Sequence, residues 1–141
     1  MDLRGFSKLL YQIKIANQEL TSKFEKETGF SLTRYELMMF LKETGKCSQK
    51  KIQCELCIDS AAVTRHLKIL EENGYVSRER NAENNREVFV EITEKAKSDL
   101  ASCEEKHDTS QNSLCHSLSQ EEEEQLGELL QKLIKKEEGL E

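Results

Sequence analysis

Residues 59–74 read Asp59-Ser60-Ala61-Ala62-Val63-Thr64-Arg65-His66-Leu67-Lys68-Ile69-Leu70-Glu71-Glu72-Asn73-Gly74. Val63, Leu67 and Leu70 are spaced four and three residues apart, and this spacing predicts a helix with one apolar face. Asp59 or Ser60 can cap the first amides of that helix, and Gly74 can adopt the left-handed conformation that ends it. We therefore expect an amphipathic helix between these two ends.

The other side of this helix carries small, polar or cationic side chains, namely Ser60, Ala61, Thr64, Arg65 and Lys68. A helix with such an edge fits the major groove of DNA, where an arginine reads guanine and a threonine methyl group can touch thymine. We interpret Arg65 and Thr64 as contacts to base edges, with the other three side chains beside them.

A second short helix is predicted over residues 48–56, immediately before a turn at residues 57–59. Two helices joined in this way have the spacing of a helix-turn-helix motif. Side chains and amides at the start of the first helix suit contacts to DNA phosphates. We assign this role to Ser48, Gln49, Lys50 and Lys51.

Two segments after the helix-turn-helix motif have the pattern of strands. Residues 75–80 alternate weakly, residues 81–86 are polar, and residues 87–92 alternate between polar and apolar side chains as a half-buried strand does. Two strands around a polar loop predict a β-hairpin, or wing.

Three segments, in this order and spacing, resemble the MarR family of winged helix-turn-helix regulators. They are Leu32-Thr33-x-x-Glu36-Leu37, then Val63-Thr64-Arg65 followed by Leu70-Glu71-Glu72-x-Gly74-Tyr75-Val76, and finally Val88-Phe89-Val90-x-Ile92-Thr93. The resemblance implies a mainly α fold with a small β-hairpin wing. It also implies a homodimer that binds double-stranded DNA and acts more often as a repressor than as an activator.

The resemblance also assigns a role to the wing tip. In the family an Asp-x-Arg pattern lies there, and its arginine enters the minor groove while the aspartate orients it. The pattern maps to Asn84-Asn85-Arg86 in this chain, which implies DNA contacts for all three residues. Because Asn84 replaces a charged aspartate, we expect weaker anchoring of the wing.

Long amphipathic helices are predicted at both ends of the chain. One runs from residue 3 to about residue 27; a capping box at Thr33 and Glu36 opens the next helix, and another capping box begins at Ser119. A stripe of Leu126, Leu129, Leu130, Leu133 and Ile134 follows the last capping box. We expect these terminal helices to pair across a two-fold axis, which gives dimerisation regions at 1–32 and 93–141 and a DNA-binding domain at 33–92.

The composition is that of a small domain with little apolar material of its own. Of 141 residues, 36% are hydrophobic and 34% are charged, so oligomerisation would supply additional burial. The net charge is −6, but residues 46–68 hold five cations against two acids, and the local field governs DNA binding.

Five cysteines and no apolar leader or membrane segment predict a protein of the reducing cytoplasm with no membrane partner.

The signal that such a regulator would sense stays open among three hypotheses. Cys54 and Cys57 flank the turn, with lysines nearby that would favour reactive thiolates, although thiols without a redox function are the simpler interpretation. Cys103 and His107 are four residues apart, with Cys115 and His116 downstream, but this pattern alone is weak for zinc, and we predict no metal site and no cofactor. A small aromatic effector could bind between the dimer helices and the DNA-binding domain, where Tyr11, Tyr35 and Met38 are candidates for its pocket.

No phosphate-binding glycine loop, nucleophile elbow or spaced carboxylate pair is present, so the sequence does not predict an enzyme. We predict a sequence-specific regulator that binds a pseudo-palindromic operator as a homodimer. The alternative is a winged-helix protein-interaction module that does not bind DNA.

Overall fold

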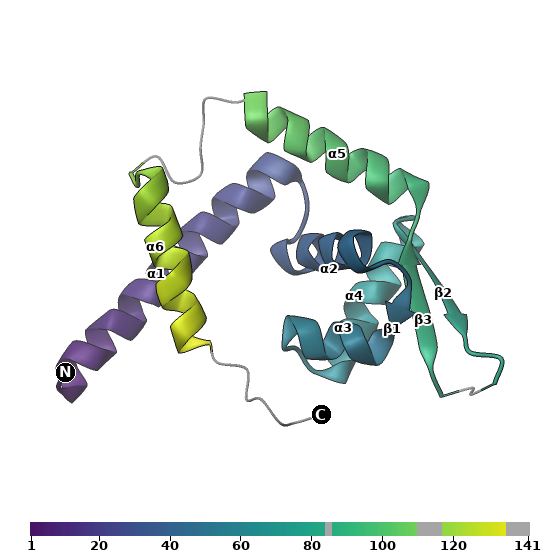
Figure 1. Cartoon of the computed structure of the whole chain (residues 1–141), viewed down its shortest axis with the longest axis horizontal. Coiled ribbons are helices and arrows are strands. Elements are labelled where there is room, and N and C mark those ends of the chain that lie inside the picture. The colour runs from purple at the N-terminus through teal and green to yellow at the C-terminus, as the bar shows by residue number, and fades with distance from the viewer. Residues whose placement is uncertain (84–85, 110–116, 135–141) are drawn as a thin grey trace. The chain divides into compact units, whose positions relative to one another are not determined.

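A computed structural model describes residues 1–83, 86–109 and 117–134 of the chain. The chain forms two units, residues 1–109 and 110–141, which we describe separately. Figure 1 shows the order of the elements, which is α1 (Leu3–Thr28), α2 (Leu32–Thr44), β1 (Cys47–Ser48), α3 (Gln49–Leu56), α4 (Ser60–Glu72), β2 (Val76–Arg80), β3 (Val88–Ile92), α5 (Glu94–Thr109) and α6 (Gln120–Leu133). This mainly helical fold with a small antiparallel sheet is the winged-helix class that the sequence predicts.

The core of the first unit is built from apolar side chains of α2, α3, α4, α5 and the sheet. Val63 and Leu67 are fully buried and Leu70 nearly so, which confirms the apolar face predicted for α4. Their partners in the core include Leu37, Met38, Leu41, Ile52, Val90 and Leu100. Met38 is therefore a core side chain, and the burial of this cluster holds α4 in place.

The sheet has the order β1-β3-β2, and both of its pairings are antiparallel. In the hairpin, Val76 pairs with Ile92 and Arg80 with Val88, which confirms the predicted wing. The sequence pattern did not predict β1, where Cys47 pairs with Val90 and is buried. Two residues are too few to show the alternation by which a strand is recognised.

The first turn of α2 corrects one expectation. Ser31, and not Thr33, is the N-cap, and its side-chain oxygen accepts a hydrogen bond from the Arg34 amide at 3.4 Å. The amide of Leu32 donates to the Glu25 carboxylate of α1 at 3.0 Å. A contact from the preceding helix thus satisfies a first-turn amide and lets α2 begin earlier than the capping-box pattern indicates.

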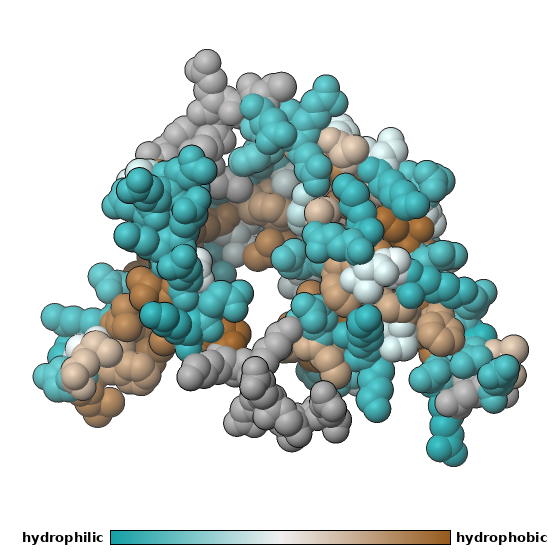
Figure 2. Space-filling model, in the orientation of Figure 1, coloured by the Kyte–Doolittle hydropathy of each residue, from teal (hydrophilic) through white to brown (hydrophobic). Residues whose placement is uncertain are grey.

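The two terminal helices expose apolar side chains. No described residue of α1 or α6 is buried, and Leu3, Leu10, Leu129 and Leu133 are each at least half exposed. Figure 2 shows the brown, apolar surface at the N-terminal end of α1, at lower left. The capping box at Ser119 and Glu122 is present as predicted. None of the described helices is long and apolar enough to cross a membrane.

Cys57, at the C-terminal end of α3, has the left-handed conformation with φ of 54°. A side chain with a Cβ is strained there, whereas glycine is not. We expect Cys57→Gly to raise the free energy of unfolding by roughly 0.5–1 kcal/mol, measured by urea denaturation.

Cys54→Gly is the matched control for this prediction, because Cys54 is an exposed residue within the same helix. Glycine inside a helix costs about 1 kcal/mol relative to a good helix former. The two variants should therefore shift stability in opposite directions, and a loss of stability in both would contradict the strain at Cys57.

Candidate nucleic-acid interface

The polar edge of α4 faces solvent. Asp59 caps the helix by accepting a hydrogen bond from the Ala62 amide at 2.7 Å. Because the apolar face is buried, the opposite face is left outside, and Ser60, Ala61, Thr64, Arg65 and Lys68 are all exposed there. The five candidate groove residues thus lie on one accessible helix face, next to one another.

Three separate segments meet beside the start of α4 in a hollow that we call the α3–wing hollow. It is lined by Ser48, Gln49, Lys50, Gln53, Ser60, Arg86, Glu87 and Val88. Five of these are residues that the sequence analysis assigned to DNA. Gln53, Glu87 and Val88 were not predicted, since only the folded wing brings residues 87–88 to α3; Asn84 and Asn85 lie outside the described residues.

The first turn of α3 carries a capped amide and two exposed cationic side chains. The side-chain oxygen of Ser48 accepts a hydrogen bond from the Lys51 amide at 3.1 Å. Lys50 and Lys51 are exposed in the first turn. Amides at a helix start and flexible lysines favour a phosphate group, so this end of α3 can position a DNA backbone against the hollow.

A hydrogen bond connects α3 directly to α4. The side-chain amide of Gln49 donates to the Thr64 hydroxyl at 2.8 Å. That hydroxyl in turn donates to the Ser60 carbonyl within α4 at 3.0 Å. The two helices of the motif are therefore joined at the end that faces outward, in addition to their shared core.

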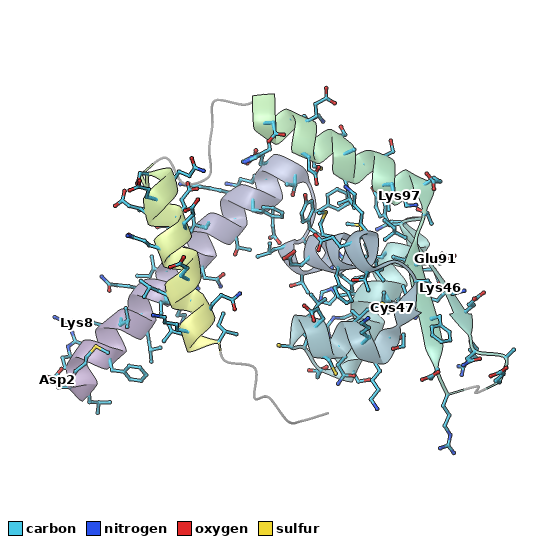
Figure 3. All side chains as sticks on the ribbon, in the orientation of Figure 1. Asp2, Lys8, Lys46, Cys47, Glu91 and Lys97 are labelled. Atoms are coloured by element: carbon cyan, nitrogen blue, oxygen red, sulfur yellow. The ribbon has the colours of Figure 1, made fainter. Side chains whose placement is uncertain are left out.

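Ion pairs attach the wing to α4 and to the loop between α2 and β1. Arg78 of β2 donates from Nε and Nη2 to both oxygens of Glu71 in α4, at 3.2 and 2.9 Å. Hydrogen bonding from Arg78 lowers the pKa of Glu71, and bonding to Glu71 raises the pKa of Arg78. Lys46, which Figure 3 shows beside Glu91 of β3, pairs with Glu79 of β2. The bidentate pair fixes the base of the wing relative to α4.

His66 connects α4 with α2. Its Nδ1 lies 3.3 Å from Nη1 of Arg34, and its ring is half-buried. Burial lowers the pKa of His66, and the positive charges of Arg34 and Arg65 lower it further. The neutral ring can accept from Arg34, whereas a protonated ring would face two cations.

The two candidate redox cysteines are exposed, and neither forms a disulfide with a described residue. The Cys57 thiol donates to the carbonyls of Cys54 and Glu55, at 3.7 and 4.0 Å, so its described partners are oxygens and not lysines. Burial raises the pKa of the third nearby cysteine, Cys47. The positive charge of Lys51 opposes this rise, but burial has the larger effect on the Cys47 thiol.

Of the three candidate pocket residues, Tyr35 and Met38 lie one turn apart on α2, and Tyr11 lies on α1. Met38 is fully buried, Tyr11 is 62% exposed on α1, and Tyr35 packs against Phe24 at 5.0 Å between ring centroids. A crevice lies elsewhere in the first unit, between the α1–α2 turn, the end of α4 and α5. Its lining includes Phe30, Arg34, Asn73, Tyr75, Lys95, Asp99 and Cys103, which are too far apart in the sequence to form a recognisable motif.

The candidate zinc residues have other partners in the described structure. The Cys103 thiol donates to the Thr28 carbonyl at 3.7 Å, and His107 lies 2.9 Å from Glu27. Among the described residues, no three histidine, cysteine or carboxylate side chains group as metal ligands do. Cys115 and His116 lie outside the described residues.

An exposed polar helix edge, a capped helix before it and an anchored wing define a winged helix-turn-helix of the DNA-binding class. The MarR family model matches residues 30–88. The chain is 36% identical over 127 residues to the uncharacterised HTH-type transcriptional regulator YdgJ of Bacillus subtilis, covering 90% of this chain and 77% of that protein. The chain therefore belongs to the MarR family of transcriptional regulators.

Other relatives agree with this assignment. The HTH-type transcriptional regulator MgrA of Staphylococcus aureus is 28% identical over 121 residues, which cover 84% of this chain and 79% of MgrA. A mutant MarR from E. coli, solved in complex with operator DNA, superposes with a TM-score of 0.79 at 21% identity and covers 96% of this chain and 100% of its own. Reduced AbfR bound to DNA gives a TM-score of 0.76 at 22% identity, with 93% of each chain covered. The relatives are transcriptional regulators and not enzymes.

The surroundings of His66 and His107 predict two opposite effects of pH on stability. The lowered pKa of His66 means that its contribution is complete above pH 6.5 and is lost as the pH falls from there through the folded-state pKa. Bonding to Glu27 raises the pKa of His107, so its contribution is complete below pH 6.5 and is lost as the pH rises through the folded-state pKa. Urea denaturation from pH 5 to 8 measures both.

Two variants separate the contributions. His66→Gln should reduce the loss of stability below pH 6.5, and His107→Gln should reduce the loss above it. Both variants replace a histidine by glutamine, so each is the control for the other. Unchanged pH profiles in both would contradict the described contacts.

Proposed function

We propose that this regulator binds a pseudo-palindromic operator as a homodimer, with α4 in the major groove and the wing against the flanking backbone. The observation that carries the proposal is the convergence of Ser48, Gln49, Lys50, Ser60 and Arg86 on the α3–wing hollow. This hollow adjoins the exposed edge of α4 that holds Thr64 and Arg65. The neighbours solved with DNA, mutant MarR and AbfR, have the same fold.

The apolar surfaces of α1 and α6 support the dimer. Leu129 and Leu133 are 57% and 66% exposed, although apolar side chains at helical spacing are normally buried. A second copy of the chain would cover them, and a two-fold axis would place two α4 helices one turn of DNA apart, ~34 Å. Such a dimer occupies both half-sites and blocks other proteins from the site, so repression in the cytoplasm is the expected outcome.

A small molecule is the signal that the structure supports best. The crevice beside α5 offers an aromatic ring, Tyr75, together with the cations Arg34 and Lys95. Lys95 lies 4.8 Å from the centre of the Tyr75 ring, and the Tyr75 hydroxyl donates to Asp99 at 2.9 Å. An effector bound in this crevice would contact α5 and the C-terminal end of α4. Its binding would therefore act on the position of α4. Selection of bound duplexes from random DNA, with and without oxidant, zinc and chelator, distinguishes this signal from redox and metal signals.

Replacement of single cations tests the DNA-binding surface. Arg65→Ala should cost ~1–3 kcal/mol of binding and relax the preference at one operator position, since a base contact is lost. Lys50→Ala should weaken binding to all duplexes alike and reduce its salt dependence, since a phosphate contact is lost. Titrations of a selected and a scrambled duplex at several salt concentrations measure both effects.

Retention of the full sequence preference by Arg65→Ala would contradict the role given to Arg65. Absence of any salt-dependent duplex binding by the intact chain would favour the protein-interaction alternative instead. Glu43→Ala, at an exposed position of α2, is a control outside the proposed surface and should leave the sequence preference unchanged.

Light scattering tests the dimer. The intact chain should be a dimer at micromolar concentration, and Leu129→Glu should shift it toward monomer because a charge enters the apolar stripe of α6. Gln131→Glu adds the same charge on another face of the helix and should remain dimeric. A folded monomer of the intact chain would contradict the proposal.

A further inference from the structure

The Gln49–Thr64 hydrogen bond restricts what Thr64 can contribute to DNA recognition. A hydroxyl group has one hydrogen to donate and two lone pairs to accept with. In this structure the hydrogen goes to the Ser60 carbonyl at 3.0 Å, and one lone pair accepts from Gln49 at 2.8 Å. Thr64 is therefore not available as a hydrogen-bond donor to a base unless its bond to the Ser60 carbonyl breaks.

The same two bonds fix the orientation of the whole side chain. Threonine in a helix chooses between two χ1 rotamers, and bonding to a carbonyl one turn earlier favours one of them. The methyl group and the hydroxyl oxygen share the same Cβ, so fixing the oxygen also fixes the methyl. Gln49, held in the first turn of α3, adds a second point of attachment from outside the helix.

We propose that Gln49 is a positioning residue that sets operator specificity through Thr64. By holding the hydroxyl, it leaves the Thr64 methyl as the group offered to a base edge, and the partner of that methyl is the C5-methyl of thymine. This inference rests on the proposed function, because it requires α4 to lie in the major groove. It gives Gln49 a role beyond the phosphate contact that the sequence analysis assigned to it.

The position of Gln49 lets it act on both kinds of DNA contact. It lines the α3–wing hollow together with Lys50 and Arg86, and its side-chain amide has one further hydrogen and an oxygen besides the bond to Thr64. A phosphate in the hollow and a base opposite Thr64 would thus be connected through one side chain.

Replacement of thymine by deoxyuridine tests the inference, because it removes only the C5-methyl group. In a duplex selected by the intact chain, each thymine is replaced in turn and affinity is measured. One replacement per half-site should weaken binding about four-fold, the value expected for one buried methyl group. Thr64→Ser, which keeps the hydroxyl and lacks the methyl, should bind the thymine and deoxyuridine duplexes equally.

Gln49→Met tests the positioning role, because it keeps the length of the side chain and removes the donor. The preference for thymine over deoxyuridine should fall from about four-fold toward none, while the urea midpoint changes little. A merely structural or phosphate-binding role would weaken both duplexes equally and leave their ratio unchanged. Gln49→Ala removes the same donor and serves as an independent second variant.

Gln53→Met is the matched control, since Gln53 lies one turn further along α3 and lines the same hollow. It should change the affinity for both duplexes by one factor and keep their ratio. If the intact chain selects duplexes but shows no sensitivity to any thymine methyl, or if Gln49→Met keeps the ratio, the inference is overturned and the proposed function stands. If no duplex is selected at all, the proposed function fails as well.

Discussion

The burial of one face of α4 is the constraint on which the rest of the structure depends. Val63, Leu67 and Leu70 face the core contributed by α2, α3, α5 and the sheet, and the removal of these side chains from water contributes roughly 1.5–3 kcal/mol each. A helix fixed by one face has no freedom to rotate about its axis. The opposite face must then lie outside, and the order of residues along α4 decides which side chains it presents.

Polar contacts at its two ends complete the positioning of α4. Gln49 bonds to Thr64 near its start, and Arg78 forms a bidentate pair with Glu71 near its end. The first contact comes from α3 and the second from the wing. The elements that would touch DNA on either side of the groove are therefore attached to the helix that would lie within it, and a displacement of α4 would move all three.

Local patterns predicted those parts of the fold that depend on neighbouring residues. The apolar face of α4, the Asp59 cap and the hairpin after Gly74 all follow from spacing and residue type within a few positions. The patterns gave a wrong prediction, or none, where a segment distant in the sequence determines the local structure. Ser31 caps α2 in a turn where Glu25 of the preceding helix holds the Leu32 amide, and β1 exists only through its pairing with β3.

The candidate site divides in the same way. The exposed face of α4 could be predicted because it is the complement of a periodic apolar stripe. The α3–wing hollow could be predicted only in part, since Glu87 and Val88 reach α3 through the folding of the hairpin. The crevice beside α5 could not be predicted, because its lining comes from four helices and the turns after α1 and α4, whose residues form no continuous pattern.

The distribution of ion pairs explains how an acidic chain can present a cationic surface. Within the described residues, Glu71 is paired with Arg78, Glu79 with Lys46 and Glu104 with Lys42, so acids of the first unit are held by cations away from the groove-facing edge. The carboxylate of Asp59 is bound to the Ala62 amide at the start of α4. The side chains of Lys50, Lys51, Arg65 and Lys68 are all exposed. Because screening limits each charge to about 10 Å at moderate ionic strength, these four cations and their immediate neighbours set the potential that a DNA backbone would meet, and the net charge of −6 does not.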